Sequence, residues 1–481
     1  MVARIPWAWL AALALFAGTR TAAAQEPMIG VDARIELLTI VFRLAGNHPE
    51  YNQCRVPAYA AAIDRWFAPV RDHEAIRRAR GLRDSAGIGF DAIPSLAIHL
   101  TDPPALAPRR PLADDSATID RRWRGIDPAP FLAALRRFAT EGRFAEFAAS
   151  ENRLYGLTTN RLREFVRAGF DHPWYQRYFG ATPALDVRFV PGICNGGANY
   201  GPRFFGADRR LELYAILGIG AVDSLGAPVF EPSMLPTMIH EVNHSFVNPV
   251  MERHRALFEA PLPEIHRAVA EDMRAMAYGS WETMLAESLV RAAVVRYLLQ
   301  HRGERAALRE IAAQEGAGFV WMGELTEALK EYETDRARWP TFSSFAPRLA
   351  EYFGGLAPRV AELVRLAGER APKIVSMSPA PGADEVDPAT DAIVVRFDRP
   401  MGGGYSINPA TKGDVAYPED GPVRAMGFDS TRTVFTWRVQ LRPERQYEMV
   451  LTGQGFRGAD GRPLRRVTYT FRTSKARPSR P

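Results

Sequence analysis

The chain has 481 residues, a formal net charge of +6 at pH 7 and a pI near 9.4. This length exceeds that of one usual hydrophobic core, so we expect two domains. The positive charge comes almost entirely from arginines spread beside Glu and Asp and not gathered in one aromatic-laced patch, which argues against nucleic-acid binding.

The N-terminus has the pattern of a signal peptide over residues 1–24. Arg4 supplies a positive start, residues 5–17 are apolar but too short to span a membrane, and Ala22 to Ala24 offer a cleavage site. An ordinary buried first helix is the alternative. No Cys stands directly after the cleavage site, so a lipid anchor is not expected there. No later segment is apolar for long enough to be a transmembrane helix. We therefore expect an exported mature protein, periplasmic or extracellular.

Residues 25–370 are dominated by helical patterns. The clearest cover Glu36–Leu44, Pro128–Phe147, Ala256–Met276, Arg305–Ala313 and Trp321–Tyr332. Two strand-like runs, 185–190 and 211–217, flank a glycine-rich loop, and a hairpin is the default connection between them. The expected class for this region is α+β, mainly helical with a small sheet.

The two cysteines, Cys54 and Cys194, both lie in the mature chain. In an oxidising compartment an even pair is a candidate disulfide. The alternative is two separately buried thiols.

An HExxH motif at His240, Glu241 and His244 is the strongest chemical signal in the chain. Two His residues four apart lie about 40° apart around a helix, so both imidazoles reach toward one metal ion. Glu241 projects beside that face, where a carboxylate can hold and deprotonate a metal-bound water. The alternative is a helix with two ordinary His residues and a solvated Glu.

The residues around the motif predict a helix. Ser233 is a candidate cap, Pro236 suits a first turn and Pro249 is expected to end the helix. The core-facing stripe is Leu235, Ile239, Val242 and Phe246.

A catalytic zinc usually takes a third protein ligand, and the sequence places it further along the chain. The metzincin pattern requires Gly and a third His where this chain has Val247 and Val250, so that subtype fits badly. A carboxylate from a second helix is the remaining arrangement.

The second helix covers residues 283–299, which are apolar on nearly every side. Thr283, Glu287 and Arg291 form one polar stripe in it, and a buried carboxylate must find a cation or hydrogen-bond donors. Glu287 is therefore the predicted third ligand, with Arg291 behind it or beside the substrate. A Glu287–Arg291 pair without metal is the alternative. Glu282 competes, but acidic residues are favoured in a first turn by the helix dipole alone.

At this point the chain resembles the gluzincin class of zinc metallopeptidases, through HEVNH and Glu287. More closely, it is similar to a family of secreted bacterial proteins with HExxHxFVNP followed by an ExxxR helix. This resemblance spans most of residues 30 to 365 and implies a zincin-like metallopeptidase fold. In zincins an edge strand beside the active site pairs with extended substrate, and residues 211–217 could be that strand. Looser matches to the family are Glu36 to Leu38, Gly196 to Tyr200, and Tyr332 to Arg336.

After Pro372 the hydrophobic period changes to two. Short alternating runs separated by turn-rich stretches predict a β-sandwich over residues 373–475. The segments 378–382 and 395–401 resemble bacterial Ig-like domains. Such a module usually serves as a spacer or binding unit, so a cell-surface or envelope partner is expected for it.

The sequence therefore predicts a secreted zinc-dependent hydrolase, most readily a peptidase acting on a peptide or protein substrate. His240, His244 and Glu287 would hold Zn²⁺, and Glu241 would take the proton of the attacking water. The candidate donors for the oxyanion are Tyr278, Tyr297, Tyr200 and Arg291. The main alternative is a non-catalytic zincin-scaffold binding protein, against which an intact Glu241 argues. A purely structural metal conflicts with the open fourth position of a His₂Glu set.

Overall fold

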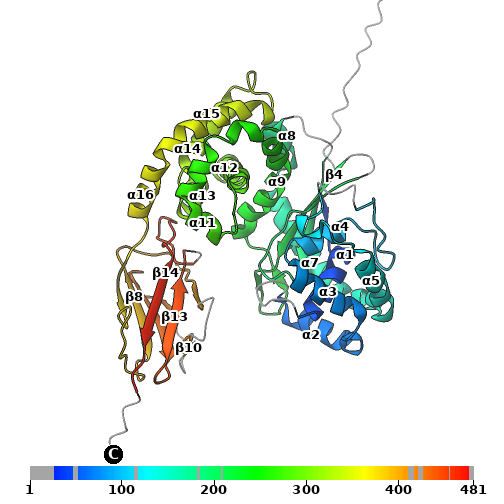
Figure 1. Cartoon of the computed structure of the whole chain (residues 1–481), viewed down its shortest axis with the longest axis horizontal. Helices are drawn as coiled ribbons and strands as arrows, with labels where there is room; N and C mark the ends of the chain where they lie inside the picture. The colour runs from blue at the N-terminus through cyan, green and yellow to red at the C-terminus, as the bar shows by residue number, and fades with distance from the viewer. Residues whose placement is uncertain are drawn as a thin grey trace, which may run out of the picture.

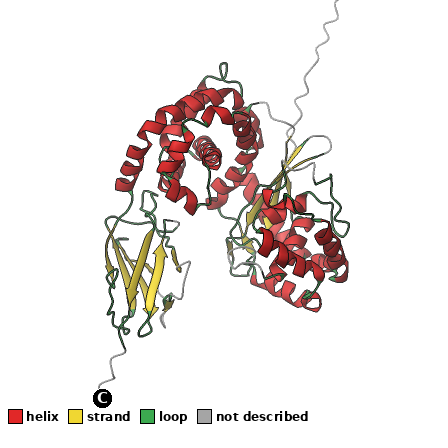
Figure 2. Cartoon of the chain, in the orientation of Figure 1, coloured by secondary structure: helices red, strands yellow, loops and turns green. Residues whose placement is uncertain are grey.

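The computed structural model describes residues 27–46, 53–112, 118–180, 185–206, 210–409, 416–420, 426–453 and 455–475. The expected signal peptide, residues 1–24, lies outside these residues. Figures 1 and 2 show a helical lobe with a sheet, a ring of longer helices, and an all-β unit near the C-terminus.

The first lobe is built around α1 (Ala33–Leu44), which is buried on almost every side. The Asp32 carboxylate caps this helix by accepting from the N–H groups of Arg34 and Ile35. The other helices of the lobe are α2 (Pro57–Trp66), α3 (Glu74–Ala86), α4 (Ala92–Ile98), α5 (Ala129–Glu141), α6 (Phe144–Ser150) and α7 (Asn152–Gly169), with short 3₁₀ turns at Ala68–Val70 and Arg121–Trp123.

A four-stranded sheet joins this lobe to the rest of the domain. Its order is β1 (Met28–Ile29), β2 (Leu185–Gly192), β4 (Leu211–Gly218) and β3 (Arg203–Phe205), and a separate short pair is formed by β5 (Ala221–Val222) and β6 (Pro228–Val229). Alternate residues of β4 pack into two different hydrophobic cores. Leu213 and Ala215 face the second lobe, whereas Tyr214 and Ile216 face the first.

Two expectations about this sheet are wrong. Strands β2 and β4 are parallel, with Leu185 opposite Leu211, so they are not a hairpin. Residues 211–217 are also not the edge, because β3 pairs antiparallel with the start of β4 and Tyr200 bridges Ile216 further along. A run buried on both faces is typical of an interior parallel strand, and β4 is buried throughout.

The second lobe is a ring of helices around α12 (Trp281–Arg302), which Figure 1 shows end-on. The surrounding helices are α8 (His172–Phe179), α9 (Leu235–Arg253), α10 (Leu262–Ala268), α11 (Ala270–Ala275), α13 (Glu304–Gly316), α14 (Met322–Thr334), α15 (Ala346–Leu356) and α16 (Val360–Arg370), with 3₁₀ turns at Pro232–Met234, Arg255–Phe258, Ser343–Phe345 and Ala357–Arg359.

Three helix predictions need correction. Residues 128–147 form two helices, because the chain turns at Gly142 and at Arg143, which has φ 52°. Residues 256–276 form a 3₁₀ turn followed by α10 and α11. Pro249 lies inside α9, and Ser233 lies in the preceding 3₁₀ turn and does not cap it. A proline removes only one backbone hydrogen bond, and continuing the helix allows Met251 to be buried.

The all-β unit begins just after α16 ends. Its strands are β7 (Ile374–Ser378), β8 (Ala392–Phe397), β9 (Ile407–Pro409), β10 (Glu419–Asp420), β11 (Met426–Phe428), β12 (Val434–Gln440), β13 (Gln446–Leu451) and β14 (Val467–Arg472). One sheet has the order β10-β12-β8-β7, with β11 also on β12, and the other has β14-β13-β9. The predicted alternation is confirmed, because Ile393, Val395, Phe435 and Trp437 are buried in the core of this unit.

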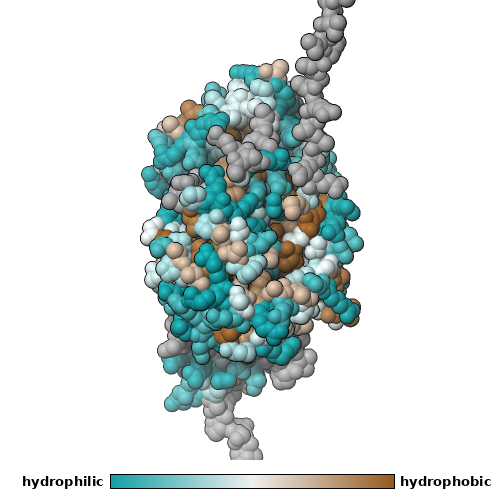
Figure 3. All heavy atoms as spheres, turned by 90° about the vertical axis from the view of Figure 1, so that its right-hand side faces the viewer, coloured by the Kyte–Doolittle hydropathy of each residue, from teal (hydrophilic) through white to brown (hydrophobic). Residues whose placement is uncertain are grey.

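Among the described residues, no helix is long and apolar enough to cross a membrane. On the face that Figure 3 draws, apolar residues occur in small groups between hydrophilic ones.

We expect residues 373–475, expressed alone, to give a β-type circular dichroism spectrum, because the core of this unit is formed by its own strands. The matching control is residues 25–370, which should give a helical spectrum. A helical spectrum for the C-terminal fragment would contradict the sandwich.

Glu36 predicts a pH dependence of stability in the first lobe. Its carboxylate is fully buried and accepts from the Tyr59 hydroxyl at 2.7 Å, and burial raises its pKa to about 7. In the unfolded chain a Glu carboxyl group has a pKa of about 4.3. The stability that depends on protonated Glu36 is therefore fully present below that pH and is lost as the pH rises through 7. This change amounts to up to about 3 kcal/mol.

Thermal unfolding at pH 5 and pH 8 tests this effect. The stability of Glu36→Gln relative to the wild type should be higher at pH 8 than at pH 5, because an amide does not ionise. Glu164→Gln, at an exposed position of α7 in the same lobe, should follow the wild type at both pH values. Equal pH profiles for wild type and Glu36→Gln would refute the assignment.

Candidate metal centre

Helices α9 and α12 bring His240, His244 and Glu287 together. The two imidazole Nε2 atoms lie 3.1 Å apart. One carboxylate oxygen of Glu287 is 3.5 Å from Nε2 of His240, and the other is 3.4 Å from Nε2 of His244. Among the described residues, these three side chains form the cluster of His, Cys, Asp and Glu that is suited to a metal ion.

The spacing of these donor atoms fits zinc. Ligands at 2.0–2.2 Å from a tetrahedral zinc are separated from one another by about 3.3–3.6 Å. The observed separations of 3.1, 3.4 and 3.5 Å lie close to that range. Two imidazoles and one carboxylate leave a fourth position open, as in catalytic sites.

Both imidazoles are held in a form suited to binding a cation. Burial, with the nearby His244 and Arg291, lowers the pKa of His240 and favours its neutral form. Nδ1 of His244 lies 3.3 Å from the side-chain oxygen of Asn248. An N–H at Nδ1 that donates to this oxygen leaves the Nε2 lone pair directed at the cluster.

Glu287 is fixed from behind by Tyr278 and Arg291. The Tyr278 hydroxyl donates to Oε2 of Glu287 at 3.0 Å, and Nε of Arg291 donates to the same oxygen at 3.2 Å. Burial and the Glu287 charge raise the pKa of Tyr278 to about 12, so its hydroxyl keeps its proton. The Glu287–Arg291 pair therefore exists alongside the approach of Glu287 to the imidazoles and does not replace it.

Two other predicted residues lie elsewhere. Glu282 is 40% exposed and accepts from Arg255 at 2.9 Å, as expected for a first-turn residue. Tyr297 was a candidate oxyanion donor, but its hydroxyl donates to the Gly169 carbonyl at 2.6 Å and accepts from the Asp171 N–H at 2.7 Å. Tyr297 therefore ties α12 to the connection between α7 and α8 and does not belong to the site.

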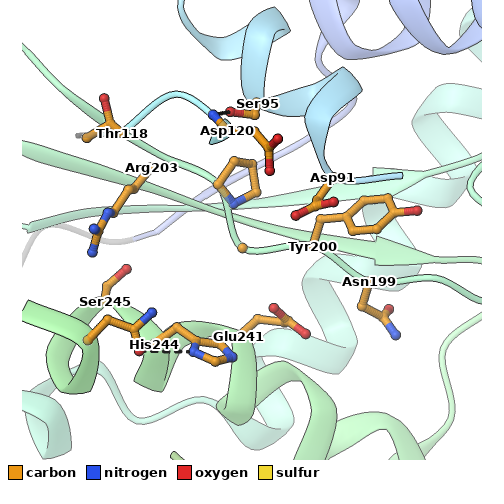
Figure 4. A pocket seen from close by; sticks show the side chains of 13 residues that line it. Asp91, Ser95, Thr118, Asp120, Asn199, Tyr200, Arg203, Glu241, His244 and Ser245 are labelled. Carbon is orange, nitrogen blue, oxygen red and sulfur yellow. Dashed lines mark hydrogen bonds between the residues drawn. The ribbon is translucent and has the colours of Figure 1, made fainter. Parts of the chain in front are cut away.

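A cavity of about 340 Å³ opens onto the motif. Glu241 and His244 lie on its α9 side, and the first lobe and the edge of the sheet form the opposite wall (Figure 4). The lining residues are Asp91, Ser95, Thr118, Asp120, Asn199, Tyr200, Gly201, Pro202, Arg203, Glu241, His244, Ser245 and Asn248.

Glu241 lies at the wall of this cavity with an altered acidity. Burial and the negative charge of Glu287 raise its pKa to about 8. Gly201 passes directly over this carboxylate, since a methyl group on Gly201 would lie 3.0 Å from its Oε2. A side chain at position 201 would therefore crowd the carboxylate.

Tyr200, the last candidate oxyanion donor, lines the cavity from the sheet edge. In Figure 4 its hydroxyl points away from Glu241 and His244. The residues that sequence reasoning missed, among them Asp91, Asp120 and Arg203, come from distant segments that carry no motif. The Gly196 to Tyr200 resemblance was the nearest signal to this wall.

A disulfide joins Cys54 to Cys194, across a sequence separation of 140 residues. This is the pair that the even cysteine number suggested. Cys194 is fully buried and begins the loop that leads to the cavity wall at Asn199. Asn199 in turn accepts from the Gly218 N–H at 3.0 Å, so the loop is tied both to the first lobe and to β4.

Comparison with known families divides the chain into two regions. A family model described as "Domain of unknown function (DUF4932)" matches residues 28–351, more than half of the chain. A second model, described as "Bacterial Ig-like domain", matches residues 368–473. The C-terminal sandwich is therefore an Ig-like domain. No curated protein matches the chain.

Solved structures give only weak likenesses. One is "Structure of surface layer protein SbsC, domains 1-6", 16% identical, covering 51% of this chain and 34% of that chain at a TM-score of 0.17. Another is "Crystal structure of the N-terminal part of the bacterial S-layer protein SbsC", 12% identical, covering 80% of this chain and 79% of that chain at a TM-score of 0.16. The chain spans about a third of the first of these proteins. TM-scores this low do not show a shared fold.

The geometry predicts which acidic residue matters for zinc affinity. Glu287→Ala removes one of three donor groups and should weaken zinc binding by more than about a hundredfold. Glu282→Ala, the matched control on the same helix, should leave the affinity unchanged, because Glu282 bonds Arg255. Zinc titration by calorimetry compares the two variants, and a larger loss for Glu282→Ala would move the third donor there.

Proposed function

We propose that this chain, which belongs to the family described as "Domain of unknown function (DUF4932)", is a zinc-dependent hydrolase and acts as a metallopeptidase. The observation that carries the proposal is the convergence of His240, His244 and Glu287 at zinc-ligand spacing. His244 of this group and the neighbouring Glu241 line a cavity. Arg291 and Tyr278 compensate the Glu287 charge from behind, and its two carboxylate oxygens still lie 3.4 and 3.5 Å from the imidazole Nε2 atoms, which supports a shared metal ion.

The residues divide the chemistry between them. Zinc, when bound, supplies a polarised substrate carbonyl and an acidified water. Glu241 would accept a proton from the attacking water and deliver it to the leaving amine. Tyr278 and Arg291 hold the Glu287 carboxylate in place and act through it.

A peptide is the substrate class that the cavity wall favours. Tyr200 exchanges backbone hydrogen bonds with Ile216, and the Pro202 carbonyl accepts from Tyr214, so these residues face β4. By the alternation of a strand, the backbone groups of Gly201 and Arg203 point the other way, past Glu241. An extended peptide can pair with such an edge.

Export is the other half of the proposal. The N-terminal signal pattern suggests it, and a disulfide between Cys54 and Cys194 is stable in an oxidising compartment and rare in the cytosol. The Ig-like domain would then place the hydrolase at a cell-surface or envelope partner.

The test is cleavage of an unfolded protein or a broad peptide mixture near neutral pH by the purified mature chain. We expect about one zinc per chain, loss of cleavage on chelation and recovery with added zinc. Glu241→Gln should abolish cleavage while zinc content and thermal stability stay unchanged, because Glu241 is not a donor in the cluster.

Glu164→Gln is the control for an unrelated loss of charge and should cleave as the wild type does. Cleavage that survives both chelator and Glu241→Gln would contradict the proposal. A zinc-loaded wild type without cleavage would favour the non-catalytic binding protein.

A further inference from the structure

Arg203 is a cation in the cavity that the proposed chemistry does not use. It is the first residue of β3, and it lines the same cavity as Glu241 and His244. Figure 4 shows its guanidinium reaching from the strand toward the turn of α9 that carries Ser245.

The guanidinium of Arg203 has no hydrogen-bond or ion-pair partner among the described residues, although the residue is only partly exposed. Burial lowers the pKa of Arg203, and the opposing charge that acts on it is that of the exposed Glu252. By contrast, two other arginines at this sheet, Arg109 and Arg188, both pair with Glu212. A partly desolvated cation without a direct ion pair is costly, and such groups are commonly found where a ligand binds.

Ser245, on the facing helix α9, supplies a second unused group at the same cavity. Its hydroxyl is buried without a hydrogen-bond partner, although the residue lines the cavity. A buried hydroxyl in a helix usually bonds the carbonyl one turn back, and this one does not. It therefore keeps an unused hydrogen-bond donor beside the cavity.

Ser245 shares one face of α9 with the proposed base, and Arg203 approaches this face from β3. Glu241, Ser245 and Asn248 follow helical spacing, and the strand segment from Gly201 to Arg203 passes along this face. Gly201 lies against Glu241, and Arg203 is two residues further, a distance of about 6–7 Å along a strand. The cationic position therefore lies within two peptide residues of the proposed base.

We propose that Arg203, together with Ser245, binds a carboxylate of the substrate, from an acidic side chain or from a free C-terminus, within about two residues of the cleaved bond. The inference rests on the proposed function, since it names the substrate class of that site. One guanidinium and one hydroxyl match a singly charged carboxylate. Asp91 and Asp120 also line the cavity and disfavour a more highly charged group.

The test measures binding, so that it does not depend on cleavage. The full mature chain carrying Glu241→Gln is loaded with zinc and titrated with three fluorescent hexapeptide pools. One pool has a Glu at each position in turn and an amidated C-terminus. The second has Gln in place of Glu, and the third is the Gln pool with a free C-terminal carboxylate.

We expect at least one carboxylate pool to bind about tenfold more tightly than the amidated Gln pool. The preferred pool tells a side-chain carboxylate from a C-terminal one. Adding Arg203→Gln should remove the preference and leave the affinity for the Gln pool unchanged. Arg203→Lys should retain part of the preference, and Ser245→Ala should reduce it.

Arg253→Gln is the matched control, because it removes the same charge from an exposed position on the last turn of α9. It should leave all three affinities unchanged. Thermal stability gives a second readout. Arg203→Gln should melt at or above the temperature of the parent chain, since it removes a desolvated cation.

Equal binding of the three pools would overturn the inference, as would an equal loss of preference with Arg253→Gln or a lower melting temperature for Arg203→Gln. The failure of the carboxylate site and the failure of the hydrolase give different results. An Arg203-dependent preference without any hydrolysis by the wild type would refute the hydrolase and keep the carboxylate site. Zinc-dependent hydrolysis with equal binding of the pools would do the reverse.

Discussion

The packing of α9 against α12 is the contact on which the candidate site depends. The buried side chain of Asn243 donates to the Val290 carbonyl at 3.1 Å and so fixes one helix against the other. Asn243 is three residues after His240, and Val290 is three residues after Glu287, so the same pairing aligns imidazole and carboxylate. A shift of α12 by one residue would turn Glu287 by about 100° and remove it from the cluster.

The charged groups around this contact lie on two sides of Glu287. Arg291 and Tyr278 compensate the buried Glu287 from behind, which leaves its carboxylate facing two imidazoles. Glu241 is on the cavity side, where burial and the same Glu287 charge favour its protonated form. One buried carboxylate thus influences both the donor cluster and the proposed base, because electrostatic interactions are strong where water is excluded.

The cavity wall opposite α9 costs stability in several places. Arg203 lacks a partner among the described residues, as does the hydroxyl of Ser245 across from it on α9, and Gly201 must remain without a side chain to pass Glu241. Unsatisfied groups gather at functional sites because selection there acts on ligand binding and not on the unliganded fold. The Cys54–Cys194 disulfide and the sheet hold this wall, so its position does not depend on the loop alone.

The sequence by itself determined the local features of this protein. The HExxH motif and its apolar stripe identified α9. The apolar residues around Glu287 marked it as a buried carboxylate, whereas the first-turn position of Glu282 accounted for that residue without burial. The distinction is readable because a buried helix face repeats with the period of the helix. Alternation after Pro372 identified the sandwich for the same reason.

Only the tertiary structure decided which distant segments meet. The edge of the sheet lies at residues 200–205 and not at 211–217, because strand order depends on pairing that no local pattern records. Tyr297 lies outside the site although it shares a helix with Glu287, because its hydroxyl is used at Gly169. Arg203 looked like any other arginine of a basic chain, and its isolation in the cavity follows from long-range packing alone.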